Sequence, residues 1–219
     1  MKKIEKDIKI LLPKIDIELD IIESIEEEFK DEGQLWGKLI SNCTIENQNI
    51  EKMQFKEVVF KDVVFKNILF NRADITDVRF ENCDLSNIDL SGSIMNRVIF
   101  QDCKMVGSNL SETSFQNVLI KKCNGKYGNF RFIRCKKVEF EDSIFNFADF
   151  QSSEFIKVTF NNSKFEGSQM SGTNLKDIDL SRSDINGIGV RVEDVEGVIV
   201  SPLQALALSS LLGLIIKEE

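Results

Sequence analysis

Residues 140–165 read FEDSIFNFADFQSSEFIKVTFNNSKF, and every fifth residue of this stretch is phenylalanine. The count continues in both directions, because 31 of the 33 positions in this register between residues 40 and 200 are Phe, Leu, Ile, Met or Val. The two exceptions are Gly125 and Cys135. A helix has a period of 3.6 residues and a flat strand a period of 2, so neither produces this pattern. A short repeat in constant phase indicates a coiling solenoid.

A slower period of 20 residues predicts how the chain coils. At every fourth repeat the residue two before the large apolar one is Val or Ile, in a series that includes Val78, Val98 and Val118. We interpret this as four five-residue sides per turn, a square coil in which residues 20 apart stack. Each turn rises by about one strand spacing, ~4.8 Å, so about eight turns form a rod on the order of 40 Å long.

The five-residue units CDLSN at 83–87, IDLSG at 88–92 and ADFQS at 148–152 resemble the A(D/N)LXX units of the pentapeptide repeat family. The resemblance extends over roughly residues 40–200. It implies an all-β solenoid, a right-handed quadrilateral β-helix. In that fold the centre residue and the residue two before it point inward, and the other three face water.

We divide the chain into an N-terminal capping segment (1–39), the repeat coil (40–200) and a C-terminal helix and tail (201–219). Lys14–Ile22 alternates apolar and charged residues, which predicts a half-buried strand, and Glu26–Glu32 an acidic turn. An open solenoid end exposes unpaired backbone, so we expect a cap; the alternative is an acidic arm that binds a partner.

One outward column of the coil is unusually apolar. Its apolar members are Leu39, Val59, Ile99, Leu119 and Ile199. Either the N-terminal strand covers part of this column, or a partner does, or the residues are scattered surface hydrophobes.

Composition argues against catalysis, a metal site and a cofactor. The chain has no histidine and no C-x-x-C, and its five cysteines (Cys43, Cys83, Cys103, Cys123 and Cys135) all fall at inward positions as small buried hydrophobes. The outward carboxylates follow a corner column that includes Asp62, Asn82, Asp102, Asp142 and Asn162, where Asp and Asn favour turns. We therefore predict a protein that is not an enzyme.

Charge and hydrophobicity limit the partners. The net charge is −8, which does not favour direct binding to nucleic acid. No long apolar run follows Met1-Lys2-Lys3, and the apolar C-terminal segment is too short to span a bilayer. We expect a reduced, cytoplasmic protein without membrane contact.

Residues 121–137 interrupt the regular pattern, because Gly125 replaces a large centre and something else must fill its space. Basic and aromatic residues gather in the same stretch without an acidic one. We name them as candidates for binding a partner: Lys121, Lys122, Lys126, Tyr127, Arg131, Phe132, Arg134, Lys136 and Lys137. The alternative is a charge ladder in which Lys121 stacks under Glu141 and Lys122 under Asp142.

The C-terminal segment predicts an uncharged helix. Ser201-Pro202 is a helix start, Leu203–Leu212 carries no charge, and Gly213 is a plausible stop. Such a helix needs burial over the end of the coil or against a second copy. Our candidates for a dimer interface are Leu203, Leu206, Leu208, Leu211, Leu212 and Ile215.

The tail residues Gly197-Val198, Gln204-Ala205 and Leu212-Gly213 resemble those of the Qnr-type branch of the family, the quinolone-resistance proteins. This resemblance implies a homodimer, joined through the C-terminal helix, that mimics duplex DNA and protects type II topoisomerase (DNA gyrase or topoisomerase IV) from quinolones. The rival hypothesis is a scaffold that binds an unknown protein. The outward charges, which sum to near zero on all four sides, favour this rival.

Overall fold

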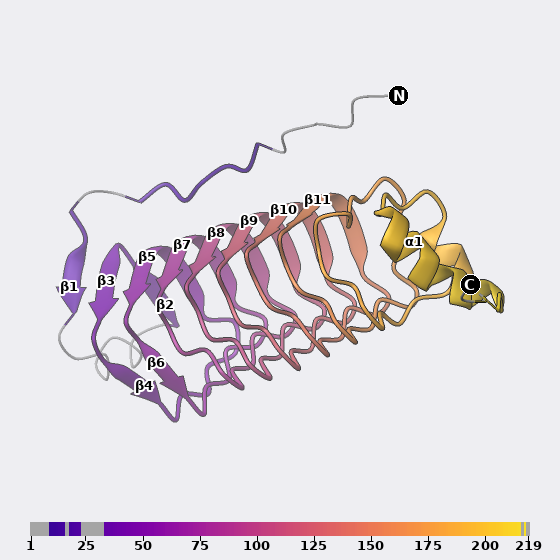
Figure 1. Cartoon of the computed structure of the whole chain (residues 1–219). Helices are drawn as coiled ribbons and strands as arrows, with labels where there is room; N and C mark the ends of the chain where they lie inside the picture. Colours follow the sequence, from indigo (N-terminus) through magenta and orange to yellow (C-terminus); the bar gives the residue numbers. More distant parts are fainter. Residues whose placement is uncertain (1–8, 16–17, 23–32, 216, 218–219) are drawn as a thin grey trace.

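The chain forms a rod of parallel strands, stacked turn upon turn and closed at one end by a short helix (Figure 1). This computed structural model describes residues 9–15, 18–22, 33–215 and 217. The strands are β1 (Asp20–Ile22), β2 (Gln34–Trp36), β3 (Lys38–Ser41), β4 (Thr44–Glu46), β5 (Gln54–Lys61), β6 (Val64–Lys66), β7 (Asp74–Glu81), β8 (Ile94–Gln101), β9 (Ser114–Lys121), β10 (Arg134–Glu141) and β11 (Glu154–Asn161). The helical segments are η1 (Val192–Val195), α1 (Pro202–Leu208) and η2 (Ser209–Leu212).

Strand pairing confirms the 20-residue period. Val78 of β7 pairs with Val98 of β8, which pairs with Val118 of β9, and every successive pair from β5 to β11 is parallel with the same offset. Bridges such as Asp84↔Lys104 repeat the offset on the other sides of the coil. The coil makes about seven turns, close to the eight that we expected.

Each long strand of the coil covers two of the four sides and turns the corner between them. β7 holds two buried centres, Ile75 and Phe80, with Asp77 between them at φ +59°. Asp77 is left out of the ladder to β8, which resumes at Val78. Arg97 and Asn117 repeat this conformation at φ +54° in β8 and β9. These corner side chains therefore form an outward column along the rod.

Stacked apolar side chains fill the interior. Phe80 lies on Phe100 with ring centroids 4.9 Å apart and planes 4° from parallel. Phe140 and Phe160 stack at 5.0 Å in the same column, two turns further on. Each buried Phe contributes roughly 1.5–3 kcal/mol relative to exposure. The coil therefore has a dry core along its length.

The cysteines are free thiols in the core wall, as the sequence predicted. Cys83, Cys103, Cys123 and Cys135 are buried and Cys43 is half-buried. The Cys123 thiol donates to the carbonyl of Phe100 at 3.4 Å, just as the Ser143 hydroxyl one turn on donates to the carbonyl of Ile120 at 3.3 Å. Hydrogen bonding to Cys123 and burial raise the pKa of Cys103 to about 12, and burial raises that of Cys135. These thiols are structural.

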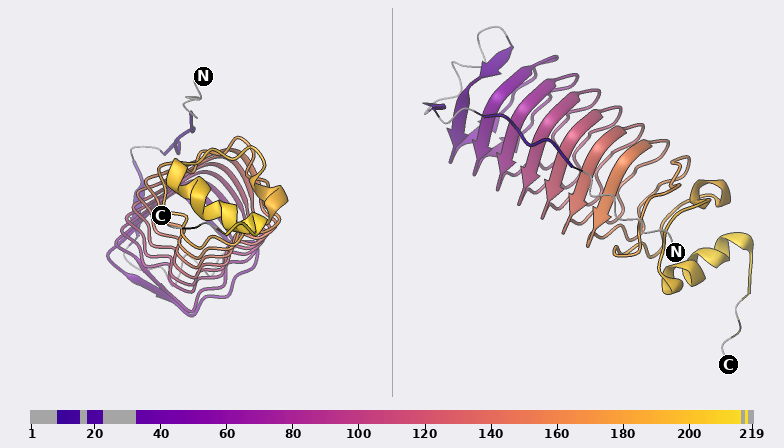
Figure 2. Two further views of the ribbon diagram at one scale, coloured as in Figure 1. Left: turned by 45° about the vertical axis from the view of Figure 1, so that its right-hand side comes forward. Right: turned by 90° about the horizontal axis from the view of Figure 1, so that it is seen from above.

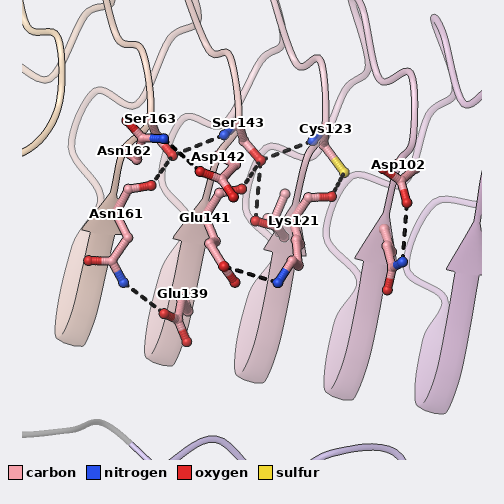
Figure 3. Close-up of polar contacts among 12 residues, drawn as sticks. Asp102, Lys121, Cys123, Glu139, Glu141, Asp142, Ser143, Asn161, Asn162 and Ser163 are labelled. Atoms are coloured by element: carbon pink, nitrogen blue, oxygen red, sulfur yellow. Dashed lines mark hydrogen bonds and ion pairs between the residues drawn. The ribbon is translucent and has the colours of Figure 1, made fainter.

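The acidic and amide corner residues are turn formers, as expected. Asp62, Asn82, Asp102, Asp142 and Asn162 all adopt positive φ, between 48° and 56°. The Asn82 side chain donates to Asp62 at 2.6 Å, and the Asn162 side chain donates to Asp142 at 2.7 Å. Figure 3 shows the contact between Asn162 and Asp142 beside the contact between Ser143 and Ser163 in the core wall. These side chains thus stand at the corners of the coil, where two of the carboxylates accept hydrogen bonds from the next turn of the coil.

The N-terminal region differs from its prediction. β1 covers Asp20–Ile22 alone, so the strand expected over Lys14–Ile22 is wrong for Lys14, Ile15, Glu18 and Leu19; residues 16–17 and the acidic turn at 26–32 lie outside the described residues. β1 pairs with β3 at the open edge of the coil, which fits a cap. β2 pairs with β5 and buries Leu35, so the coil starts five residues before Ile40. Residues 9–15 cross the side of the rod (Figure 2, right).

At the other end, α1 lies across the opening of the coil, as the view along the rod shows (Figure 2, left). Ser201 caps the start of α1, because its hydroxyl accepts from the backbone N–H of Gln204, and Gly213, with φ +69°, caps the end of η2. Both ends match the sequence prediction. Within the part of the chain that the structure describes, no helix has the length and apolar character to cross a membrane.

The ring of Phe145 fills the space that the absent side chain of Gly125 leaves in the core. A methyl group built on Gly125 would overlap this ring, which also packs edge-on against Phe130 at 5.4 Å. The coil therefore needs no cavity at this irregular position.

We predict that Gly125→Leu destabilises the coil by roughly 1–3 kcal/mol, because the new side chain competes with Phe145 for the same volume. Denaturant unfolding of both proteins measures the difference. Adding Phe145→Leu to Gly125→Leu should recover part of the loss, since the smaller neighbour frees space. A Gly125→Leu protein as stable as the wild type would contradict this description of the core.

Candidate partner-binding surfaces

The basic and aromatic candidates surround one turn of the coil. Lys121 ends β9, and Arg134, Lys136 and Lys137 lie in β10. The other five lie on the path between these strands: Lys122, Lys126, Tyr127, Arg131 and Phe132. Because that path runs around the remaining sides, the structure brings only parts of the set together.

Ion pairs between adjacent turns engage two of these cations, Lys121 and Arg131. Lys121 Nζ lies 3.0 Å from Glu141, which is the charge ladder that we held as the alternative (Figure 3). Hydrogen bonding to Glu141 raises the pKa of Lys121. Arg131 lies 3.8 Å from Asp149 and also over the ring of Phe132. Lys122 and Asp142 do not form the other expected ion pair; the side chain of Asn162 donates to Asp142 instead.

Three of the basic candidates lie together in the first part of β10, up to its corner, and we call this part of the surface the basic side. Arg134, Lys136 and Lys137 stand there, and Lys157 of β11 is the next member of the corner column that contains Lys137. Lys157 was missed in the sequence analysis, because the candidates were taken from residues 121–137 alone. Its position 20 residues after Lys137 was the signal that could have found it.

An exposed aromatic pair lies on a different side. Tyr127 is 62% exposed and stacks on Phe147, one turn further, with centroids 5.5 Å apart and planes 10° from parallel. Next in the column is Gly167, where an added methyl group would collide with the Phe147 ring. Sequence reasoning missed Phe147, although the 20-residue spacing places it directly beyond Tyr127.

The C-terminal helix is attached to the last turn through Gln204. The Gln204 side chain donates to the carbonyls of Leu180 at 2.9 Å and Ser183 at 2.6 Å, and accepts from the backbone N–H of Ser201 at 2.8 Å. The side-chain amide of Gln204 therefore provides hydrogen-bond partners both for carbonyl groups of the last turn and for a backbone N–H at the start of the helix. A cavity of about 220 Å³ remains beside it, lined by residues of both elements that include Gly187 and Ala207.

The six candidate interface residues divide into two groups. Leu208 and Leu211 are half-buried and pack against the core of the coil. Leu203 (80% exposed), Leu206, Leu212 (63% exposed) and Ile215 face outward. The first group caps the coil, and the second leaves an apolar surface at the end of the rod.

Asp194 closes the turn before the helix. Its carboxylate is buried and accepts from the backbone N–H groups of Gly172 and Arg191, both at 2.9 Å, and from the Arg191 guanidinium at 3.0 Å. Burial alone would raise the pKa of Asp194, but the hydrogen bonds and the charge of Arg191 hold it below its usual value. The ionised form is therefore the stabilising one.

No group of three or more metal-binding side chains lies within the described residues. The candidate surfaces are therefore an aromatic pair, a basic side and an apolar end. Such surfaces suit contacts with another macromolecule.

Comparisons with known proteins agree on the repeat. A family model described as pentapeptide repeat region matches residues 73–144, and a second, described as pentapeptide repeats (8 copies), matches residues 143–182. No curated protein sequence matches the chain.

Several solved structures are similar in fold. A trypsin-treated variant of QnrB1, a plasmid-mediated fluoroquinolone resistance protein, is 20% identical over 84% of this chain and 99% of its own, with a TM-score of 0.47. Full-length QnrB1 is 16% identical over 80% of this chain and 100% of its own, at 0.44. HetL from the cyanobacterium Nostoc sp. strain PCC 7120, a pentapeptide repeat protein involved in heterocyst differentiation regulation, is 10% identical over 76% and 89%, at 0.41.

We predict that Asp194→Asn lowers the unfolding free energy by roughly 1–3 kcal/mol at neutral pH, because a buried charged acceptor is lost. The folded pKa of Asp194 lies below the unfolded one, so its contribution is complete above the unfolded pKa of about 3.9 and falls as pH drops through the folded pKa. Denaturant unfolding against pH should show the two proteins converging in acid. A constant difference down to the lowest pH would contradict this role.

Proposed function

Because this chain belongs to the pentapeptide repeat family, whose shape is a rod of stacked turns, we propose that it is a dimeric, non-enzymatic protein that binds a type II topoisomerase and shields it from quinolones. The observation that carries this proposal is the C-terminal end. The residues that resemble the Qnr-type tail include Gln204, the amide that attaches α1 to the last turn. α1 presents Leu203 outward, and η2, which follows it, presents Leu212 outward.

The dimensions suit a substitute for duplex DNA. Seven turns at ~4.8 Å give a rod of roughly 34 Å, and two rods joined at their helices would span about 70 Å. At 3.4 Å per base pair this corresponds to a duplex of about 20 base pairs. A dimer of this length would offer an enzyme a continuous, stiff surface.

The charge pattern supports a second candidate, a scaffold that binds a different protein. Opposite charges on adjacent turns pair along the sides, as in Lys104–Asp84 at 3.0 Å and Arg72–Glu51 at 2.8 Å. Pairing of this kind offsets opposite charges between adjacent turns, whereas duplex DNA is uniformly negative. The scaffold would use the basic side of β10 and the aromatic pair Tyr127–Phe147 as its contacts.

We predict that replacing both Leu203 and Leu212 by Glu converts a dimer into a monomer, because two charges would enter an apolar interface. Sedimentation equilibrium measures the mass, and thermal unfolding checks that the coil keeps its stability, since neither side chain packs in the core. Leu69→Glu is the matched control: it alters an exposed leucine on the side of the rod and should stay dimeric. A monomeric wild-type protein, or a dimeric double variant, would contradict the proposed interface.

We predict that the purified protein restores supercoiling by DNA gyrase in the presence of ciprofloxacin, and that the Leu203→Glu/Leu212→Glu protein does so at least tenfold less well. Titration of each protein into the supercoiling reaction, with and without drug, gives the measurement, and Leu69→Glu again serves as control. If micromolar protein neither protects nor inhibits the enzyme, the topoisomerase proposal fails and the scaffold remains.

A further inference from the structure

Two outward polar side chains on the side of the rod that residues 9–15 cross are buried. Asp77 and Asn117 belong to the corner column of the long strands, and they are 4% and 3% exposed. Lys157, in the same column, is exposed. The two buried members are those that contact residues 9–15, which cross this side of the rod (Figure 1).

Both hydrogen bonds from residues 9–15 to the column come from backbone N–H groups. The N–H of Lys14 donates to Asp77 Oδ1 at 2.8 Å, and the N–H of Leu11 donates to Asn117 Oδ1 at 3.4 Å. Between these rungs Arg97 binds Asp77 through both Nε, at 2.6 Å, and Nη2. Arg97 thereby fixes the Asp77 carboxylate in position to accept from the crossing segment.

The spacing of the two acceptors matches an extended chain. Asp77 and Asn117 lie two turns apart, about 9.6 Å at ~4.8 Å per turn. Lys14 and Leu11 are three residues apart, about 10 Å at ~3.3 Å per extended residue. Corner side chains two turns apart can therefore accept hydrogen bonds from the backbone N–H groups of every third residue of an extended peptide that runs along the rod.

Pro13 fits between these two contacts. Its side chain is buried, while its neighbours Leu11, Leu12 and Lys14 are exposed. Proline has no backbone N–H, so no donor is left unpaired at this position, where the column offers no acceptor. The fixed φ of proline also favours the extended conformation. Ile99, in the adjacent apolar column, is also buried, as expected if the N-terminal segment covers part of it.

Within residues 9–15, two hydrogen bonds to the coil and one buried side chain, that of Pro13, are few compared with the contacts of the paired strands beneath them. A segment held so lightly can leave while the coil stays folded. We propose that the corner column at Asp77, Arg97 and Asn117 is a binding site for an extended, proline-containing peptide, that residues 9–15 occupy it within the same chain, and that a segment of this kind from another protein binds there when they leave. This inference is independent of the proposed topoisomerase partner.

Release of the segment is the first test. Pro13→Asp places a charge at the buried position of the segment and leaves the column intact, whereas Leu12→Asp makes the same change at its exposed neighbour. Hydrogen exchange of the full-length proteins should show at least tenfold protection of the Leu11 and Lys14 amides in the wild type and in Leu12→Asp, and none in Pro13→Asp. Unprotected amides in the wild type, or protection that disappears on dilution, would overturn occupancy within one chain.

Binding of a separate peptide is the second test. A fluorescent peptide with the sequence of residues 9–15 should bind Pro13→Asp at least tenfold more tightly than the wild type, whose site is occupied. Adding Asn117→Ala to Pro13→Asp removes one acceptor and should abolish this gain, whereas adding Leu69→Glu should not. Equal binding to the wild type and Pro13→Asp, or no effect of Asn117→Ala, would overturn the site.

Discussion

The structure depends on one constraint: an inward-facing side chain at every fifth residue must meet its counterpart 20 residues later. Backbone hydrogen bonds between parallel segments set the spacing of the turns, and the stacked rings fill that spacing without gaps, as Phe80 and Phe100 do at 4.9 Å. Neither interaction suffices alone, because unstacked rings would leave cavities and an unfilled coil would collapse. The corners then require positive φ once per side, which explains the Asp and Asn ladders.

The same stacking governs the surface. Any outward side chain lies about 5 Å from those one turn before and after it, so like charges repel and opposite charges pair along the rod. Lys121 with Glu141 and Lys104 with Asp84 are the result. In a repeat of this kind, residues 20 apart in the sequence lie next to each other on the surface. A functional surface is therefore a column of such residues and not a continuous stretch of sequence. The basic side at Lys137 and Lys157, the pair Tyr127–Phe147 and the acceptors Asp77 and Asn117 are all arranged in this way.

Period and composition made most of the coil predictable. Register, core, free cysteines, corner turns and the C-terminal helix followed from residue types at fixed spacing, because each turn repeats the environment of the last. The N-terminal region has no repeat, and there alternation of apolar and charged residues predicted a strand over Lys14–Ile22, whereas the backbone N–H of Lys14 donates to the side chain of Asp77 in a distant turn. The basic candidates were grouped by proximity in sequence, which in a square coil distributes them over several sides. The burial of Asp77 could not be predicted from the repeat, because it depends on a segment more than sixty residues earlier in the sequence.

The most direct test of the account measures how distance grows with turn number. Spin labels placed by Lys61→Cys with Glu141→Cys, and by Lys61→Cys with Asn161→Cys, would lie in one outward column, in a Cys43→Ser background that leaves the remaining native thiols buried. Four and five turns at ~4.8 Å predict separations of about 19 and 24 Å, before allowance for the labels, by pulsed electron paramagnetic resonance. A separation that does not increase by about one strand spacing between the two pairs would contradict the stacked square coil, and with it every surface derived from it.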